Sequence, residues 1–320
     1  GKLYTRVWGY GDKRSPGITW PGRTFQIQSG LAGGDPETTV VWNNGLTGVS
    51  QHLLPVDTSL HWCYALHGYT NRTIARDGVP IITHLHGGHT DFQFDGNPEF
   101  FYTPRSRVVG PQWANVPGGF TNRYRYDNNV PAGTLWYHDH ALGITRLNVY
   151  AGMAGFYFVR DSQDTGTANN QLGLPAWPYE KAYAIQDRMF TTAGSLFYPA
   201  YPGDPFYDDF ITEPLSPDVF PNGGPTALAE FFGDHMVVNG IVWPYEDVER
   251  RAYRFHLLNG TDSRFMALQF VEVDPGVEDP NDGNASGPLP FTVIGSDQGL
   301  ASSPTGGVTT LLSEPGSRYD

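Results

Sequence analysis

Gly133-Thr134-Leu135-Trp136-Tyr137-His138-Asp139-His140 is an apolar and aromatic run, typical of a buried strand, that ends in two histidines. A second pair, His84-Leu85-His86, follows the short apolar run Pro80-Ile81-Ile82-Thr83. Successive side chains of an extended strand point to opposite faces, so the two imidazoles of each pair lie on the same face. Four neutral imidazoles that arrive on neighbouring strands form a soft-to-borderline metal site, suited to copper, zinc or iron.

The amino-acid composition indicates a folded, turn-rich β protein. The 320 residues include 19 Phe, 18 Tyr and 8 Trp, which are residue types enriched in strands. Glycine (39) and proline (26) make up about a fifth of the chain, below the roughly 25–30% that is typical of disorder. At roughly 100–200 residues per domain, this length predicts two domains. We therefore expect an all-β fold.

Alternation of apolar and polar residues, together with turn signals, predicts further strands. Asn239-Gly240 between two apolar runs predicts a hairpin over 236–243, because a type I′ turn needs positive φ at both positions. Between His140 and Ala151 the apolar spacing loosens to three or four residues, which favours a helical turn. The other predicted strands are 24–28, 38–42, 155–159, 182–186, 253–258, 265–273 and 291–294.

Shifts in composition divide the chain into two modules. We expect a first domain over residues 1–161, which carries both His pairs, and a second over residues 179–320. A linker over 162–178 joins them and begins with the small and polar residues 162–170. A proline-rich loop extends to about Pro225, broken by the strand at 182–186.

The charge balance argues against nucleic acid as a partner. The chain has 20 basic and 33 acidic residues, a net charge of -13, whereas phosphates demand a basic face. The longest uncharged apolar stretch, near 150–159, is far shorter than the about 20 residues of a membrane helix, so no membrane partner is expected. The single cysteine, Cys63, cannot form an intramolecular disulfide. Export is left open, because a processed chain also lacks a signal peptide.

The two His pairs and their surroundings resemble the multicopper oxidases. The run that follows the second pair is similar to the bacterial branch that contains spore-coat laccase, bilirubin oxidase and phenoxazinone synthase. The resemblance covers nearly the whole chain, as N-terminal domains of that family, and is carried by residues 84–88, 133–140, 145–152, 194–199, 238–245 and 295–299.

This resemblance implies a fold, a cofactor and a set of ligands. The fold is tandem cupredoxin-like Greek-key β-sandwiches, with the second one incomplete at the C-terminus. By position, His84 is a ligand of a type 2 copper, and His86, His138 and His140 bind a type 3 copper pair. Such a trinuclear copper centre reduces dioxygen to water, with electrons from a phenol, an aromatic amine, a pigment or a metal ion.

Asp95 is the candidate for supplying protons. It lies eleven residues after His84, and in the resembling branch an acid at this spacing sits near the type 2 copper and acts as a proton relay. The competing interpretation is structural, because Asp95-Gly96 is also typical of an Asx turn.

The remaining histidines and the cysteine are interpreted as structural. His89 follows the first pair closely, but the family assigns no copper to its position. A blue-copper site needs two His and one Cys, and the family's cysteine lies in a His-Cys-His motif near its C-terminus, so Cys63 is expected to be structural. Ordinary polar or partly buried roles are expected for His52, His61, His67, His235 and His256.

Half of the family's ligand motifs are absent from these 320 residues. The other two His motifs, which complete the trinuclear centre and build the type 1 site, are missing. We therefore expect an N-terminal portion of a three-domain oxidase. Its C-terminal remainder comes as a second chain, as the other half of a nicked chain, or from sequence outside these residues, and the portion alone oxidises nothing.

Three other functions compete with this interpretation. A non-catalytic cupredoxin-fold protein for partner binding usually loses the copper histidines, whereas all four are present here. A zinc hydrolase lacks support, because no glutamate stands in a general-base position and the His-Glu-x-x-His pattern is absent. A two-domain copper nitrite reductase is disfavoured by the lack of a cysteine ligand motif in the first module.

Overall fold

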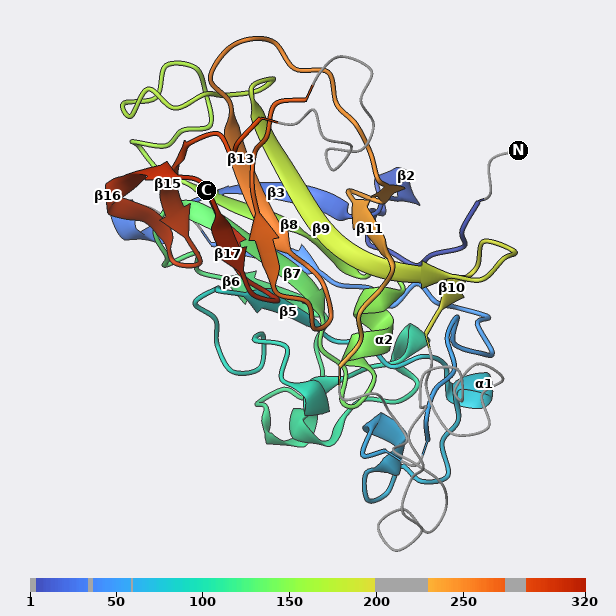
Figure 1. Cartoon of the computed structure of the whole chain (residues 1–320). Coiled ribbons are helices and arrows are strands. Elements are labelled where there is room, and N and C mark those ends of the chain that lie inside the picture. The colour runs from blue at the N-terminus through green and yellow to red at the C-terminus, as the bar shows by residue number, and fades with distance from the viewer. Residues whose placement is uncertain (1–3, 34–36, 59, 199–229, 274–285) are drawn as a thin grey trace, which may run out of the picture.

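β-Strands make up most of the regular structure (Figure 1). The computed structural model describes residues 4–33, 37–58, 60–198, 230–273 and 286–320. The strands before residue 161 are β1 (Gly11–Asp12), β2 (Ser15–Ile18), β3 (Gly22–Gln28), β4 (Thr38–Val41), β5 (Thr83–His86), β6 (Arg123–Tyr126), β7 (Gly133–Asp139) and β8 (Ala154–Arg160). The later strands are β9 (Glu180–Phe190), β10 (Leu196–Phe197), β11 (His235–Val238), β12 (Ile241–Val242), β13 (Arg254–Asn259), β14 (Met266–Leu268), β15 (Phe291–Ser296), β16 (Gly299–Val308), β17 (Leu311–Ser313) and β18 (Arg318–Tyr319).

The helices of the described residues are short. The two α-helices are α1 (Ile74–Asp77) and α2 (Thr145–Tyr150), and the second confirms the predicted helical turn after His140. The 3₁₀ turns are η1 (Gly30–Ala32), η2 (Cys63–Ala65), η3 (Pro98–Phe100), η4 (Pro104–Ser106) and η5 (Pro111–Asn115). No helix among them has the length and apolar character needed to cross a bilayer. The all-β class predicted from composition is confirmed.

Two sheets carry the architecture. The smaller has the strand order β3-β8-β7-β5, and the larger has the order β12-β11-β9-β13-β18-β15-β16 with β10 beside β9. In each sheet one neighbouring pair is parallel, β3 with β8 and β9 with β13. Figure 1 shows β9 as the long strand that runs beside β13. The smaller sheet ends before residue 161 and the larger begins after 179, while the domain limits themselves stay a prediction.

Strand β7 is buried along its whole length because both of its faces are covered. Leu135 and Tyr137 pack into the largest apolar cluster, which also holds Trp42 and Tyr157. The alternate residue Trp136 packs on the other face, in a cluster with Ala184 and Leu258 from the larger sheet. A strand covered on both faces reads as a near-continuous apolar run, which explains the sequence of this segment.

An aromatic cluster surrounds Tyr137 and fixes the smaller sheet. The ring of Tyr137 lies 5.0 Å from Tyr10, 5.4 Å from Phe25 and 5.3 Å from Trp42, between ring centroids. Its hydroxyl donates to the backbone carbonyl of Arg23 at 2.7 Å, so the polar end of the ring is satisfied. This packing fixes one face of β7, and His138 lies on the other face, the face of Trp136.

The hairpin at Asn239-Gly240 is confirmed. These two residues join β11 to β12 with φ values of 50° and 81°, as a type I′ turn requires. The predicted strand at 265–273 is shorter than expected and contains only β14 (Met266–Leu268). Strand β16 was not predicted, because Gly299–Val308 is rich in Gly, Ser and Pro and shows no alternation.

The predicted linker differs from a solvated connection. Asp164 within it is 1% exposed and forms a salt bridge to Arg254 of β13 at 2.8 Å. Arg160 at the end of β8 also contacts Asp164, at 3.3 Å. The segment is therefore tied to the sheets by buried ion pairs. Of the predicted proline-rich loop, residues 199–229 lie outside the described residues.

We expect Gly155→Ala to lower the free energy of unfolding by about 1–3 kcal/mol, the range for overpacking a filled core. A methyl group at 155 would lie 2.7 Å from Cε1 of Tyr137, so the ring has to leave its aromatic cluster. Chemical denaturation measures the change. Gly45→Ala is the control, because residue 45 is exposed and a Cβ there meets nothing within 4 Å. An equal loss in both variants would contradict the prediction.

Candidate metal centre

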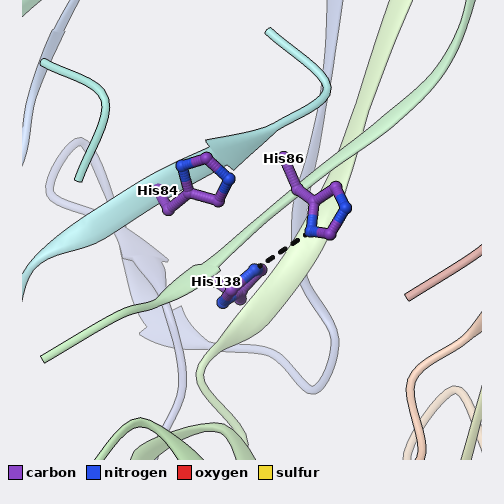
Figure 2. A group of neighbouring side chains, drawn as sticks. All are labelled: His84, His86 and His138. Carbon is purple, nitrogen blue, oxygen red and sulfur yellow. Dashed lines mark hydrogen bonds between the residues drawn. The ribbon is translucent and has the colours of Figure 1, made fainter. Parts of the chain in front are cut away.

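The two His pairs lie on neighbouring antiparallel strands. In the β5–β7 register, His84 is directly opposite His138, and Leu85 is opposite Tyr137. Leu85 belongs to the apolar core, so the alternation of the strand turns His84 and His86 to the other face. Figure 2 shows these two rings from β5 and the His138 ring from β7 pointing into one space.

All four predicted ligands are brought together. The ring centroid of His84 lies 5.5 Å from His86, 5.4 Å from His138 and 5.2 Å from His140. One ligand nitrogen from each of His84, His86 and His138 can be chosen so that all three lie within 4.8 Å of one another. His140 follows the last residue of β7, and its backbone N–H donates to the carbonyl of Ile82 at 2.7 Å. The closeness of His86 to His138 expected from the sequence is confirmed, with 5.6 Å between ring centroids.

Backbone carbonyls orient two of the rings. His138 Nδ1 donates to the carbonyl of Asp139 at 2.7 Å, and His84 Nδ1 donates to the carbonyl of Asp95. A proton held on Nδ1 leaves Nε2 with its lone pair, which is the form that binds a metal. His138 Nε2 lies 3.4 Å from His86 Nδ1, the contact drawn in Figure 2. In the described part of the chain, Nδ1 of His140 is buried without a hydrogen-bond partner.

Burial favours the neutral form of three of these imidazoles, those of His86, His138 and His140. Burial, with the Arg318 guanidinium as the second cause, lowers the pKa of His86 to about 4. Burial also lowers the pKa of His138 well below its ordinary value, and it lowers the pKa of His140. A neutral imidazole is the ligand form, so protons compete weakly with a metal at this cluster.

Two residues that the sequence analysis did not assign cover the cluster. Trp136 is 5% exposed, stacks on His86 at 5.2 Å and lies 4.2 Å from His138, between ring centroids. Gly316, near the C-terminal end of the chain, lies against the His86 ring, since a Cβ there would be 3.4 Å from Cε1. Trp136 was visible within the His138 motif, whereas no sequence signal indicated Gly316.

Arg318 places a buried positive charge beside the first His pair. It is 1% exposed, and its Nε donates to the carbonyl of Thr134 at 3.0 Å. Its Nη1 lies 3.1 Å from Oδ1 of Asp297, which compensates the charge. Gly87, at φ +90°, leaves room for this guanidinium, because a Cβ there would lie 2.7 Å from Nη2. This arginine also had no signal in the sequence.

Asp95 lies beside His84. Besides the backbone contact to His84, its Oδ1 is 3.5 Å from His84 Nδ1, and its side chain is 49% exposed. The same oxygen accepts from the Thr90 hydroxyl at 2.8 Å. An Asx turn requires a hydrogen bond from the backbone N–H two residues on to the side-chain oxygen. Among the hydrogen bonds of the described residues, the Asp95 carboxylate has no such bond. Its role in proton transfer stays a prediction.

The other candidates lie apart from the cluster or have structural contacts. His89 is exposed and bonds Asp127 through Nδ1 at 2.6 Å. The Cys63 thiol is buried and donates to the carbonyl of Leu142 at 3.4 Å. Burial raises the pKa of this thiol well above its ordinary value, which agrees with the structural role expected for it. His256 is buried between Thr134 and Glu180, with contacts of 2.6 Å and 2.7 Å.

Comparison with known proteins agrees with this geometry. The sequence profile of the family described as multicopper oxidase matches residues 105–164, which include His138 and His140. A laccase from Bacillus subtilis is 34% identical over 296 residues, covering 92% of this chain and 46% of that protein. The multicopper oxidase LPR1 of Arabidopsis thaliana is 32% identical, covering 97% of this chain and 43% of that protein.

The chain is a member of the multicopper oxidase family. A solved variant of McoA, a multicopper oxidase from Aquifex aeolicus, superposes with a TM-score of 0.55 at 28% identity, over 76% of this chain and 42% of that one. The predicted cupredoxin-like fold is thereby confirmed. The chain spans less than half the length of these relatives.

The residues present fit the copper that this family implies. The donor set consists of imidazoles alone, which suit both oxidation states of copper. The unpartnered Nδ1 of His140 is a buried polar atom that the described protein leaves unsatisfied. Buried polar groups are almost always bonded, so this nitrogen also fits a ligand role. His84, His86, His138 and His140 are the residues that would hold the metal.

The low pKa of His86 predicts that acid destabilises the metal-free protein. Between pH 6.5 and about 4 the folded chain binds fewer protons at this ring than the unfolded chain, so stability falls as the pH is lowered. We expect His86→Gln to flatten this dependence by up to about 1.4 kcal/mol per pH unit, as measured by urea denaturation.

The comparison with the variant is needed because Asp139 acts with the opposite sign. Burial raises its pKa to about 7, so stability from this group rises as the pH falls through that value. The difference between wild type and His86→Gln isolates the imidazole. Identical pH dependence in the two proteins would show that His86 is not held neutral.

Proposed function

We propose that this chain is part of a laccase-like copper oxidase that reduces dioxygen to water at a trinuclear copper centre. The supporting observation is that four imidazoles, from β5, from β7 and from the residue after β7, converge on one face. The ring centroid of His140 lies 5.2 Å from that of His84 and 5.7 Å from that of His138. When bound, copper supplies the redox chemistry that passes electrons from the reductant to dioxygen.

The protein's own residues would bind the copper ions and shield the site from water. We propose His84 as a type 2 copper ligand, and His86, His138 and His140 as ligands of a type 3 pair. Trp136 covers the rings of His86 and His138 from one side and excludes water there. Water exclusion matters because electrostatic interactions strengthen when a site is dry.

The missing ligands and the type 1 site would come from a C-terminal remainder, as a second chain, a nicked half or further sequence. This proposal rests on the absence of two family motifs from the 320 residues and on the fraction of each relative that the chain covers. The reductant is expected to be a small phenol, aromatic amine, pigment or metal ion, because several relatives are named laccases. A non-catalytic cupredoxin-fold role is weaker, since all four imidazoles are retained.

Asp95 is proposed to relay protons to the site. Reducing dioxygen to water consumes protons, and they must cross from solvent to the cluster. The Asp95 side chain is half exposed while its Oδ1 lies 3.5 Å from His84 Nδ1, so one group reaches both solvent and the cluster. A positioned carboxyl of this kind typically contributes 10²–10⁴-fold to a rate.

We expect His138→Ala, in the whole oxidase, to lower oxygen consumption at least about 100-fold and to lower bound copper per molecule. Even partners behind a ligand cost 10–100-fold, so loss of a ligand costs at least as much. Oxygen consumption with a phenol and elemental analysis are the measurements. His235→Ala is the control, since that ring is partly exposed and contacts Asp234 and Phe190 instead of the cluster. The proposed function would be refuted by full turnover in His138→Ala. It would also be refuted if elemental analysis found no copper in the wild-type oxidase.

We expect Asp95→Asn to lower turnover about 10²–10⁴-fold while copper content stays at the wild-type value. The amide keeps the size of the side chain but cannot release a proton. Turnover measured across pH, with copper analysis on the same samples, tests this. Asp91→Asn is the matched control, an exposed neighbour whose nearest cation is Arg125 at 3.9 Å. If the two substitutions lowered turnover equally, Asp95 would have no specific role in proton transfer.

A further inference from the structure

A fully buried carboxylate lies between the ligands His138 and His140. Asp139 is 0% exposed, and its side chain points away from the histidine face because strand residues alternate. Its Oδ1 accepts from the backbone N–H of Ile82 at 3.0 Å, and its Oδ2 accepts from the N–H of Ala141 at 3.0 Å. Within the described residues, no cation forms a salt bridge with it.

Asn148 of α2 supplies the third donor to this carboxylate. Its Nδ2 donates to Asp139 Oδ2 at 2.8 Å and to the carbonyl of Pro80 at 3.1 Å. Both partners are acceptors, so the amide can only present its nitrogen to them and its oxygen to the opposite side. The side chain is 0% exposed, which leaves it no solvent partner.

The orientation of Asn148 in turn fixes the tautomer of His52. His52 Nε2 lies 3.0 Å from Asn148 Oδ1, which accepts, so Nε2 carries the proton. His52 Nδ1 accepts from the backbone N–H of Leu54 at 3.0 Å, so it carries none. The ring is therefore neutral, in agreement with burial that lowers its pKa to about 4.

These bonds form one chain, in which the Leu54 N–H donates to His52, His52 donates to Asn148, and Asn148 donates to Asp139. The carboxylate at its end binds two backbone N–H groups near the proposed metal site, those of Ile82 and Ala141, besides the side chain of Asn148. Ile82 lies two residues before His84, and Ala141 directly follows His140. Both ends of the histidine face are thus held by a carboxylate that Asn148 and His52 hold in position.

We propose that Asn148 and His52 are positioning residues for the copper ligands, acting through Asp139. Outer partners of metal ligands fix their orientation, and losing one typically costs 10–100-fold in metal affinity. Asp139 lies directly between two of these ligands in the sequence, and three neutral donors among the described residues hold its carboxyl group in place. The inference rests on the proposed copper site.

The test compares Asn148→Leu with Asn170→Leu in the whole oxidase. Asn170 is also a buried asparagine, but its side-chain bonds go to Thr167 and Leu174, in a loop of its own. Copper affinity is measured by competition with a chelator, and deuterium exchange of the Ile82 and Ala141 amides is measured in the metal-free protein. We expect Asn148→Leu to weaken copper binding about 10–100-fold and to speed exchange at both amides. The control changes neither.

A second pair of variants keeps the proposal testable where Asn148→Leu folds poorly. His52→Gln retains a donor and an acceptor and is expected to bind copper more tightly than His52→Leu. Copper affinity within twofold of wild type in both Asn148→Leu and His52→Leu would overturn the proposal. Wild-type protein that binds no copper would refute the proposed function instead. In that case unchanged amide exchange at Ile82 and Ala141 would overturn the positioning role separately.

Discussion

The antiparallel register between β5 and β7 is the constraint on which the proposed metal centre depends. It sets His84 opposite His138 and leaves Leu85 and Tyr137 for the core. A slip of one residue in either strand would turn every imidazole of that strand into the aromatic cluster and expose apolar side chains. Burial of the core face therefore stabilises this register. The positions of the proposed ligands are thus fixed by the packing of core residues that are not ligands themselves.

The second face of β7 is covered from far along the chain. Trp136 packs with Ala184 and Leu258, and Arg318 bonds the backbone of Thr134 across 184 residues of sequence. The larger sheet thus covers this face of β7. Such contacts cannot be predicted from a motif, because their sequence separation leaves no periodic trace.

Features that depend on residues close together in the sequence could be predicted, whereas features that depend on distant residues could not. Strand alternation predicted the four histidines on one face, and Asn239-Gly240 predicted its hairpin, because both signals are local. Asp95 was singled out because the resembling family branch carries an acid at this spacing from the first His pair. The sequence did not reveal the buried Asp164 within the linker or the strand over 299–308. The first depends on Arg254, 90 residues away, and the second on pairing with β15 rather than on its own residues.

Two buried ionisable groups, Arg318 and Asp139, flank the histidine cluster, and their partners differ. Arg318, beside His86, has Asp297 at 3.1 Å, so much of its field is cancelled locally. Asp139, behind His138 and His140, has only neutral donors among the described residues. Burial raises the pKa of Asp139 to about 7, so a cation on the β7 side of the cluster would favour its ionised form. The neutral imidazoles of His86 and His138, with an ionisable carboxyl group behind them, would together favour a metal ion over protons at this proposed site.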